Sequence, residues 1–178
     1  MGRPIAITPG DPCGIGPEIV ARAWCQAPDL TQGCFVAGDV GLMGEVARAA
    51  QSAGAQTMGV IPVHLMSAER GKRDLTSFVI TEDMHERKKV MFMNSDAIVV
   101  LPGGAGSLDE FFEVLTWAQI GLHSKPIILL DNQGYWQPLI ALIDHVISQG
   151  FAEPGLRGKF GTAADVPALI EQLRTRFL

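Results

Sequence analysis

The residues from Pro102 to Glu110 combine a glycine-rich turn with a hydroxyl group and a carboxylate. Glycines let a backbone approach a ligand closely and adopt positive φ angles. The helical pattern after the turn would supply unpaired N–H groups and the positive end of a helix dipole, which together suit a phosphate. The segment therefore predicts a phosphate cradle with the carboxylate of Glu110 attached to it and the hydroxyl of Ser107 as a further donor.

The same two residues have a simpler interpretation. Ser107 and Glu110 show the S-x-x-E spacing of a capping box, in which a helix starting at Ser107 would use both side chains only to satisfy its own terminus. Judged by this spacing alone, the cap and the ligand site are equal alternatives, and the wider pattern of the chain must separate them.

Short apolar runs alternate with longer helical patterns along the chain. We predict strands at 4–8, 34–38, 57–61, 77–81, 97–101 and 126–130, and helices at 17–27, 42–53, 84–94, 108–121, 135–149 and about 164–178. Several strands are apolar throughout, which is typical of strands covered on both faces. The alternation predicts one α/β domain over residues 1–178, built on a Rossmann-like, doubly wound parallel sheet. Such sheets bind ligands beyond the carboxyl ends of their strands, where the Gly-rich segments 9–16, 38–44 and 102–106 fall.

Composition narrows the class of protein. The 178 residues suffice for one domain, and a hydrophobic content of 47% with 19% charged residues indicates a globular protein. A net charge of -5 offers no broad attraction to nucleic acid or to an anionic membrane, so a bound phosphate needs a local site. We expect no membrane span and no secretory signal, because apolar runs are short. The three cysteines, Cys13, Cys25 and Cys34, lack metal-like spacing and fit reduced thiols of a cytoplasmic protein.

Four motifs in close succession carry a family resemblance. They are Met84-His-Glu-Arg-Lys-Lys89, Asn94-Ser-Asp-Ala97, Leu101-Pro-Gly-Gly-Ala-Gly-Ser-Leu-Asp-Glu110 and Phe112-Glu-Val-Leu-Thr-Trp-Ala118. From about residue 41 onward the chain resembles the LONELY GUY-type cytokinin riboside 5'-monophosphate phosphoribohydrolases, often labelled lysine decarboxylases. Their fingerprint is PGGxGTxxE with an upstream MHxRK. The resemblance implies hydrolysis of the N-glycosidic bond of AMP or an N6-prenylated AMP, giving free base and ribose 5-phosphate without cofactor or metal.

The resemblance also implies roles for single residues. Arg87 and Glu110 would be the catalytic pair. A carboxylate stabilises oxocarbenium character on the sugar and orients or deprotonates the attacking water, while the guanidinium holds phosphate or ribose or assists the departing base. The implied nucleotide-binding positions are Gly103, Gly104, Ala105, Gly106, Ser107, Lys88, Gly41, Met84 and Glu113.

Simpler roles stay open for several of these residues and their neighbours. Lys88 has the alternative of an exposed helix lysine, and Glu113 that of an ordinary polar residue one turn after Glu110. His85 fits a surface or capping histidine. Core or subunit contacts are the expected role of Phe111, Phe112, Leu115 and Trp117. The expected partners are a small-molecule nucleotide and a second copy of the chain, as a homodimer or larger assembly, with no nucleic acid and no membrane.

The first forty residues depart from that family. The segment from Ile5 to Ile19 resembles the opening of 4-hydroxythreonine-4-phosphate dehydrogenase, so we infer a fusion with its junction near residue 41. We expect residues 1–41 to complete the sheet as a substitute first β-α-β unit. Because loop 9–16 replaces the family's first loop, and Val36 and Ala37 stand where glycines are expected, a nucleotide-binding module with reduced or no catalysis is the alternative function.

Overall fold

The computed structural model describes residues 5–8, 48, 50–52, 54–66 and 75–177. Its strands are β1 (Ile5–Thr8), β2 (Met58–Pro62), β3 (Ser77–Thr81), β4 (Ala97–Val100), β5 (Ile127–Leu130) and β6 (Gly161–Ala163). Its α-helices are α4 (Met84–Met93), α5 (Ala105–Gln119), α6 (Gln137–Ser148) and α7 (Val166–Phe177), with short 3-10 turns η1 (Val63–Leu65), η2 (Asn132–Gly134) and η3 (Pro154–Lys159). The described part is therefore α/β, as predicted.

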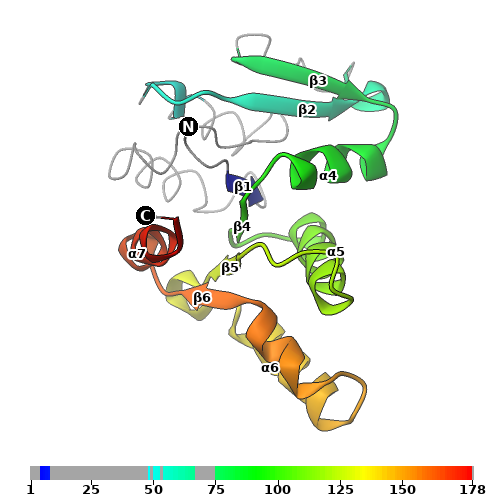
Figure 1. The fold of residues 1–178 in the computed structure, drawn as a ribbon, viewed down its shortest axis with the longest axis vertical. Coiled ribbons are helices and arrows are strands. Elements are labelled where there is room, and N and C mark those ends of the chain that lie inside the picture. The colour runs from blue at the N-terminus through cyan, green and yellow to red at the C-terminus, as the bar shows by residue number, and fades with distance from the viewer. Residues whose placement is uncertain (1–4, 9–47, 49, 53, 67–74, 178) are drawn as a thin grey trace.

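All strand pairs in the described part are parallel. A four-stranded sheet has the order β1-β4-β5-β6, with Ile5 opposite Ala97, Ile98 opposite Ile127 and Ile128 opposite Gly161. β2 and β3 form a second parallel pair. Since β4 pairs directly with β1, the N-terminal strand belongs to this sheet and lies next to the strand that leads into the glycine-rich turn (Figure 1).

Helices cover both faces of the four-stranded sheet (Figure 1). Residues of β4 and β5 alternate between the two faces, as a period of two requires. Val99 and Ile128 pack in the cluster formed with α7, whereas Ile98 and Ile127 pack in the cluster formed with α5 and α6. All residues of β4 and β5 are buried. Because both faces are covered, these strands are apolar runs, and the predicted doubly wound arrangement is confirmed.

Helix α4 packs against the β2–β3 pair. Met91 packs with Val60 of β2 and with half-buried Val79 of β3. The helix thereby joins the β2–β3 pair to the region where β4 and α5 meet (Figure 1). This placement brings the Arg87-Lys88 motif of α4 next to α5.

Several predicted boundaries need correction. Helix α5 begins at Ala105 and not at Leu108, so the turn itself contributes the first helical residues. β6 was not predicted, because three residues of Gly-Thr-Ala make no apolar run of strand length. The predicted strand 34–38, helix 17–27 and the three cysteines lie outside the described residues, as does most of helix 42–53. Among the described residues, no helix combines the length and the apolar character needed to cross a membrane.

Two adjacent phenylalanines of α5 test this packing. Phe111 is 0% exposed and makes an edge contact with Phe160 at 5.4 Å between ring centroids, whereas Phe112 is 40% exposed. We expect Phe111→Ala to lower the free energy of unfolding by about 3–5 kcal/mol, because it empties a closed site in the core. Phe112→Ala is the matched control, with an expected cost of about 1 kcal/mol. Urea unfolding measures both, and equal losses in the two variants would contradict the described packing.

Candidate functional site

The site is built where two parallel strands end and two helices begin. β3 ends at Thr81 before α4, and β4 ends at Val100 before α5. In parallel α/β sheets the carboxyl ends of the strands carry the ligand sites. The two helix starts differ in how their backbone N–H groups are satisfied, and this difference decides where an anion can bind.

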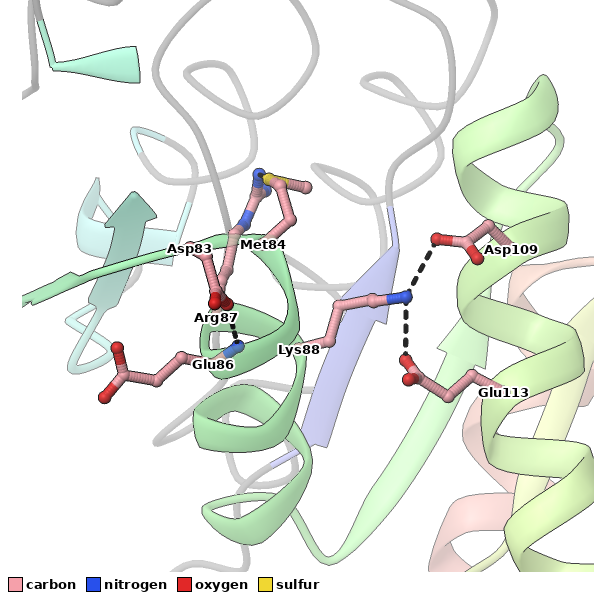
Figure 2. Close-up of polar contacts among 7 residues, drawn as sticks. All are labelled: Asp83, Met84, Glu86, Arg87, Lys88, Asp109 and Glu113. Atoms are coloured by element: carbon pink, nitrogen blue, oxygen red, sulfur yellow. Dashed lines mark hydrogen bonds and ion pairs between the residues drawn. The ribbon is translucent and has the colours of Figure 1, made fainter. Parts of the chain in front are cut away.

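The start of α4 is satisfied by its own residues. The carboxylate of the N-cap residue Asp83 accepts a hydrogen bond of 2.8 Å from the Glu86 N–H, and that N–H lowers the pKa of Asp83. The carboxylate of Glu86 in turn accepts from the Glu82 N–H at 2.6 Å. Figure 2 shows Asp83 and Glu86 at this terminus. With its donors occupied, α4 serves as a rigid support for Arg87 and Lys88.

The start of α5 is open. Its N-cap is Gly104, which has no side chain to form a capping hydrogen bond. The Leu108 N–H donates to the Gly104 carbonyl at 3.2 Å, and this is the first backbone hydrogen bond of the helix. Gly104, Ala105 and Gly106 are exposed, and a Cβ added at Gly104 or Gly106 would meet no atom of the described residues within 4 Å. The unpaired N–H groups of the first turn therefore face space that an anion can occupy.

The structure decides between the two interpretations of Ser107 and Glu110. Ser107 is the third residue of the helix and not its N-cap, so Ser107 and Glu110 do not form a capping box. The glycines of this turn do not use positive φ angles: Gly104 has φ -90, and the positive-φ glycines of the described part are Gly54, Gly121, Gly134 and Gly150. The glycines of this turn are therefore suited to let a ligand approach the backbone closely. Ser107 itself is buried.

Lys88 joins the two helices. Its Nζ lies 3.0 Å from Asp109 Oδ2 and 3.0 Å from Glu113 Oε2, two residues one turn apart on α5 (Figure 2). Burial alone would lower the pKa of Lys88, but the hydrogen bonds and charges of the two carboxylates outweigh it and raise the pKa. The lysine side chain is only 10% exposed, so the exposed-helix-lysine interpretation is wrong. Glu113, whose role was left open, belongs to the same charged cluster.

Glu110 lies on α5 between the two carboxylates that Lys88 binds. Burial raises the pKa of Glu110, the charge of Arg87 partly offsets this, and the charge of Asp109 adds to the rise. The predicted catalytic pair is therefore electrostatically coupled in the structure. A carboxylate whose pKa is raised by burial beside a fixed cation is suited to proton transfer.

Arg87 is buried, with 7% of its surface exposed. Its Nη1 contacts the sulfur of Met84 at 3.7 Å, and its Nε has no hydrogen-bond partner among the described residues. A guanidinium stays charged at all physiological pH values and favours bidentate binding of phosphate or carboxylate. An unsatisfied N–H on a buried cation is the property expected of a residue that binds an anionic ligand.

A cavity opens between α4 and α5 beside these charges. It is a small, shallow hollow, and its lining residues are Lys88, Met91, Phe92, Ile98, Glu110, Glu113, Val114 and Trp117. Trp117 makes an edge contact with Phe92 at 4.8 Å between ring centroids. The accessible surface of the hollow is almost wholly apolar, although Lys88, Glu110 and Glu113 are among its lining residues, so it suits the edge of an apolar ring.

The structure brings most of the predicted residues together. Lys88, Glu110 and Glu113 line the hollow between α4 and α5, the charge of Arg87 acts on Glu110, and the turn 103–106 lies at the start of α5. Gly41 lies outside the described residues, and His85 is exposed, as predicted. No group of three or more His, Cys, Asp or Glu side chains in the described part is arranged to hold a metal ion.

Two residues near the site were missed. Asp109 binds Lys88, and its spacing of four from Glu113 on a helix was a usable signal. Tyr135 donates a hydrogen bond from its hydroxyl to the Gly103 carbonyl at 2.9 Å. Nothing in the sequence pairs two turns that lie 32 residues apart, so this contact was not predictable.

The chain has clear relatives in sequence. Residues 43–173 match the family model described as possible lysine decarboxylase. A probable cytokinin riboside 5'-monophosphate phosphoribohydrolase of Oryza sativa subsp. japonica is 43% identical over 159 residues, 89% of this chain and 67% of the relative. The cytokinin riboside 5'-monophosphate phosphoribohydrolase of Rhodococcoides fascians is 41% identical over 137 residues, 76% of this chain and 69% of the relative. This chain covers 62% of the length of a second relative from Oryza sativa subsp. japonica.

Solved structures resemble the fold over nearly the whole chain. The molybdenum cofactor carrier protein of Chlamydomonas reinhardtii superposes with a TM-score of 0.67 at 20% identity, covering 98% of this chain and 99% of that chain. The molybdenum cofactor binding protein of Rippkaea orientalis has a TM-score of 0.69 at 17% identity, covering 100% and 99%. At these identities the likeness concerns the fold alone.

The half-buried carboxylate gives a pH-dependent prediction for stability. Because the pKa of Glu110 is raised in the folded chain, its contribution to stability is lost as pH rises through that pKa. We therefore expect Glu110→Gln to be more stable than the native chain at pH 7.5, with the difference vanishing as pH falls below about 4.3, the ordinary glutamate value. Glu113→Gln, which removes a partner of Lys88, is the control and should destabilise at pH 7.5. Thermal unfolding at several pH values measures both, and a Glu110→Gln variant less stable than native at pH 7.5 would contradict the assignment.

Proposed function

The chain belongs to the cytokinin riboside 5'-monophosphate phosphoribohydrolase family, and from this premise we propose that it hydrolyses the N-glycosidic bond of a nucleoside 5'-monophosphate. The substrate is AMP or an N6-prenylated AMP, and the products are the free base and ribose 5-phosphate. The observation that carries the proposal is the half-buried carboxylate of Glu110, whose pKa the charge of Arg87 lowers against the effect of burial and which lies on the helix whose open N-terminus suits a phosphate.

The proposed binding mode depends on the open start of α5. The 5'-phosphate accepts hydrogen bonds from the first-turn N–H groups around residues 103–107, where exposed glycines admit it closely. Arg87, with an unsatisfied buried N–H, supplies a fixed positive charge to the phosphate or the ribose. The base then lies at the mouth of the apolar hollow between α4 and α5, whose lining includes Trp117 and Phe92.

The proposed chemistry uses Glu110 twice. As the C1'–N bond breaks, its electron pair leaves with the base, and the Glu110 carboxylate stabilises the positive charge that develops on the ribose. The carboxylate also takes a proton from the attacking water, whose oxygen forms the new bond to C1'. The raised pKa of Glu110 makes it a better proton acceptor than an ordinary carboxylate. The departing base takes up a proton from solvent and Glu110 returns its proton to solvent, so one water is consumed and atoms and charge balance without a cofactor.

The proposal has a direct test in base release. Incubating the chain with AMP, and separately with isopentenyladenosine monophosphate, should give free base and ribose 5-phosphate detectable by chromatography. We expect Glu110→Gln to lower kcat about 100- to 10,000-fold, the usual range for loss of an acid–base group, while calorimetric binding of AMP is kept. Asp109→Asn, which changes the exposed neighbour on the same helix, is the matched control and should lose less than about tenfold.

The outcomes separate the enzyme from its alternative. AMP binding without any base release at high protein concentration would replace the enzyme with a nucleotide-binding module. Equal kcat values for native and Glu110→Gln chains would remove Glu110 from the chemistry.

We also propose that residues 1–41 serve as a substitute first β-α-β unit derived from a 4-hydroxythreonine-4-phosphate dehydrogenase-like segment. The pairing of β1 with β4 supports a role in completing the sheet. The match of 159 residues to the rice relative is longer than the chain from residue 41 to its end, so part of the N-terminal segment also aligns with this family.

Truncation tests the structural role of this segment. Removing residues 1–41 takes away the partner of β4, whose residues are all buried, so we expect the shortened chain to be insoluble or unfolded by circular dichroism. Removing only residues 1–4 leaves β1 in place and should give folded protein. A soluble, folded chain lacking residues 1–41 would contradict the role.

Self-association is a further part of the proposal. Exposed apolar side chains at the end of α5, with Ile120 at 64% and Leu122 at 67%, offer a surface that a second copy would cover. Light scattering at micromolar concentration measures the state of the chain.

A further inference from the structure

A tyrosine connects the phosphate-binding turn to the neighbouring strand. The Tyr135 hydroxyl donates to the Gly103 carbonyl at 2.9 Å, and the two residues come after β5 and β4, which are adjacent and parallel. The ring is 50% exposed, so burial contributes little to its placement. Its position depends on the loop that carries it.

The backbone conformation of that loop directs the side chain of Tyr135. Gln133 and Gly134 have φ angles of 56 and 75, so two successive residues are left-handed, and for glutamine this is an uncommon conformation. Strained backbone of this kind persists only where its surroundings determine it, and it gathers at functional sites. Tyr135 is the next residue in the chain, so the left-handed pair sets the direction in which its side chain leaves the loop.

The residues around Tyr135 supply the determining contacts. The carboxylate of Asp131 accepts from the Trp136 N–H at 2.6 Å and from the side-chain amide of Gln137. The Tyr135 N–H donates to the Asn132 carbonyl at 3.3 Å. Trp136 is only 3% exposed and makes an edge contact with the tyrosine ring at 4.9 Å. The tyrosine is thus held from both sides while its hydroxyl reaches the turn.

The hydrogen bond from the Tyr135 hydroxyl orients the whole peptide group between Gly103 and Gly104. In a planar trans peptide the C=O and the N–H point in opposite directions, so holding the Gly103 oxygen also orients the Gly104 N–H. Gly104 is the N-cap of α5, with open space where its Cβ would be. Two successive glycines have the greatest backbone freedom of any residue pair, so this peptide needs an external constraint to hold one orientation.

We propose that Tyr135 is a positioning residue that orients the Gly103–Gly104 peptide toward the 5'-phosphate of the substrate. This inference rests on the proposed function, since it assigns the turn to the phosphate. It predicts a selective effect: losing the hydroxyl weakens ligands that carry the phosphate and leaves ligands without it unchanged.

Tyr135→Phe keeps the ring and removes only the hydroxyl. We expect calorimetric binding of AMP and of ribose 5-phosphate to weaken about five- to tenfold, the value of one lost orienting hydrogen bond, while adenosine binding stays within about twofold. For AMP hydrolysis, KM should rise by the same factor with kcat unchanged within about twofold, because Glu110 and Arg87 are untouched. Ser148→Ala is the matched control, since it removes a hydroxyl-to-carbonyl bond of 2.8 Å in α6 and should change no binding constant.

Each other outcome overturns the inference. Unchanged AMP binding in Tyr135→Phe would show that the hydroxyl does not position the peptide. Equal weakening of AMP and adenosine would indicate general damage to the site. Absence of AMP binding by the native chain would overturn the proposed function and this inference together, whereas native binding equal to that of the variant overturns the inference alone.

Discussion

The ion pairs of Lys88 connect the two helices on which the site depends. The ammonium group lies 3.0 Å from carboxylates on successive turns of α5, and the lysine side chain is 10% exposed while that of Asp109 is 64% exposed. The two ion pairs connect α4 to α5 at this point. Glu110 lies between the paired carboxylates, and Arg87 precedes the lysine. In the proposed function Lys88 therefore links the helices that carry the two proposed catalytic residues.

The N-termini of α4 and α5 have different roles in the proposed site. Asp83 and Glu86 satisfy the start of α4, which leaves that helix free to act as a support. The start of α5 keeps a glycine at its N-cap and exposes its first-turn N–H groups. Had Ser107 been the cap, the same donors would have been partly occupied. Within the described part of the chain, α5 has no capping side chain, and in the proposed function its first-turn donors are those that the phosphate binds.

Apolar runs and motif spacing predicted most of the described fold. β4 and β5 are buried on both faces, so their sequences carry a strong signal, whereas the three small residues of β6 carry none. The motifs predicted Arg87 and Glu110 as site residues, but the ion pairs of Lys88 with Asp109 and Glu113 were not predicted, because the lysine on α4 and the acids on α5 are distant in sequence. The start of α5 was misplaced because Ala105 and Gly106 look like turn residues until the helix beyond them organises their backbone. The contact between Tyr135 and Gly103 depends on the adjacency of β4 and β5, which no local pattern records.

The central claim is that the phosphate binds at the start of α5 and the ribose lies beside Glu110. A crystal structure of the chain with ribose 5-phosphate bound tests it most directly. The account predicts phosphate oxygens within hydrogen-bond distance of the N–H groups of residues 104–107 and the anomeric carbon facing the Glu110 carboxylate. A phosphate bound elsewhere, or an anomeric carbon turned away from Glu110, would contradict it.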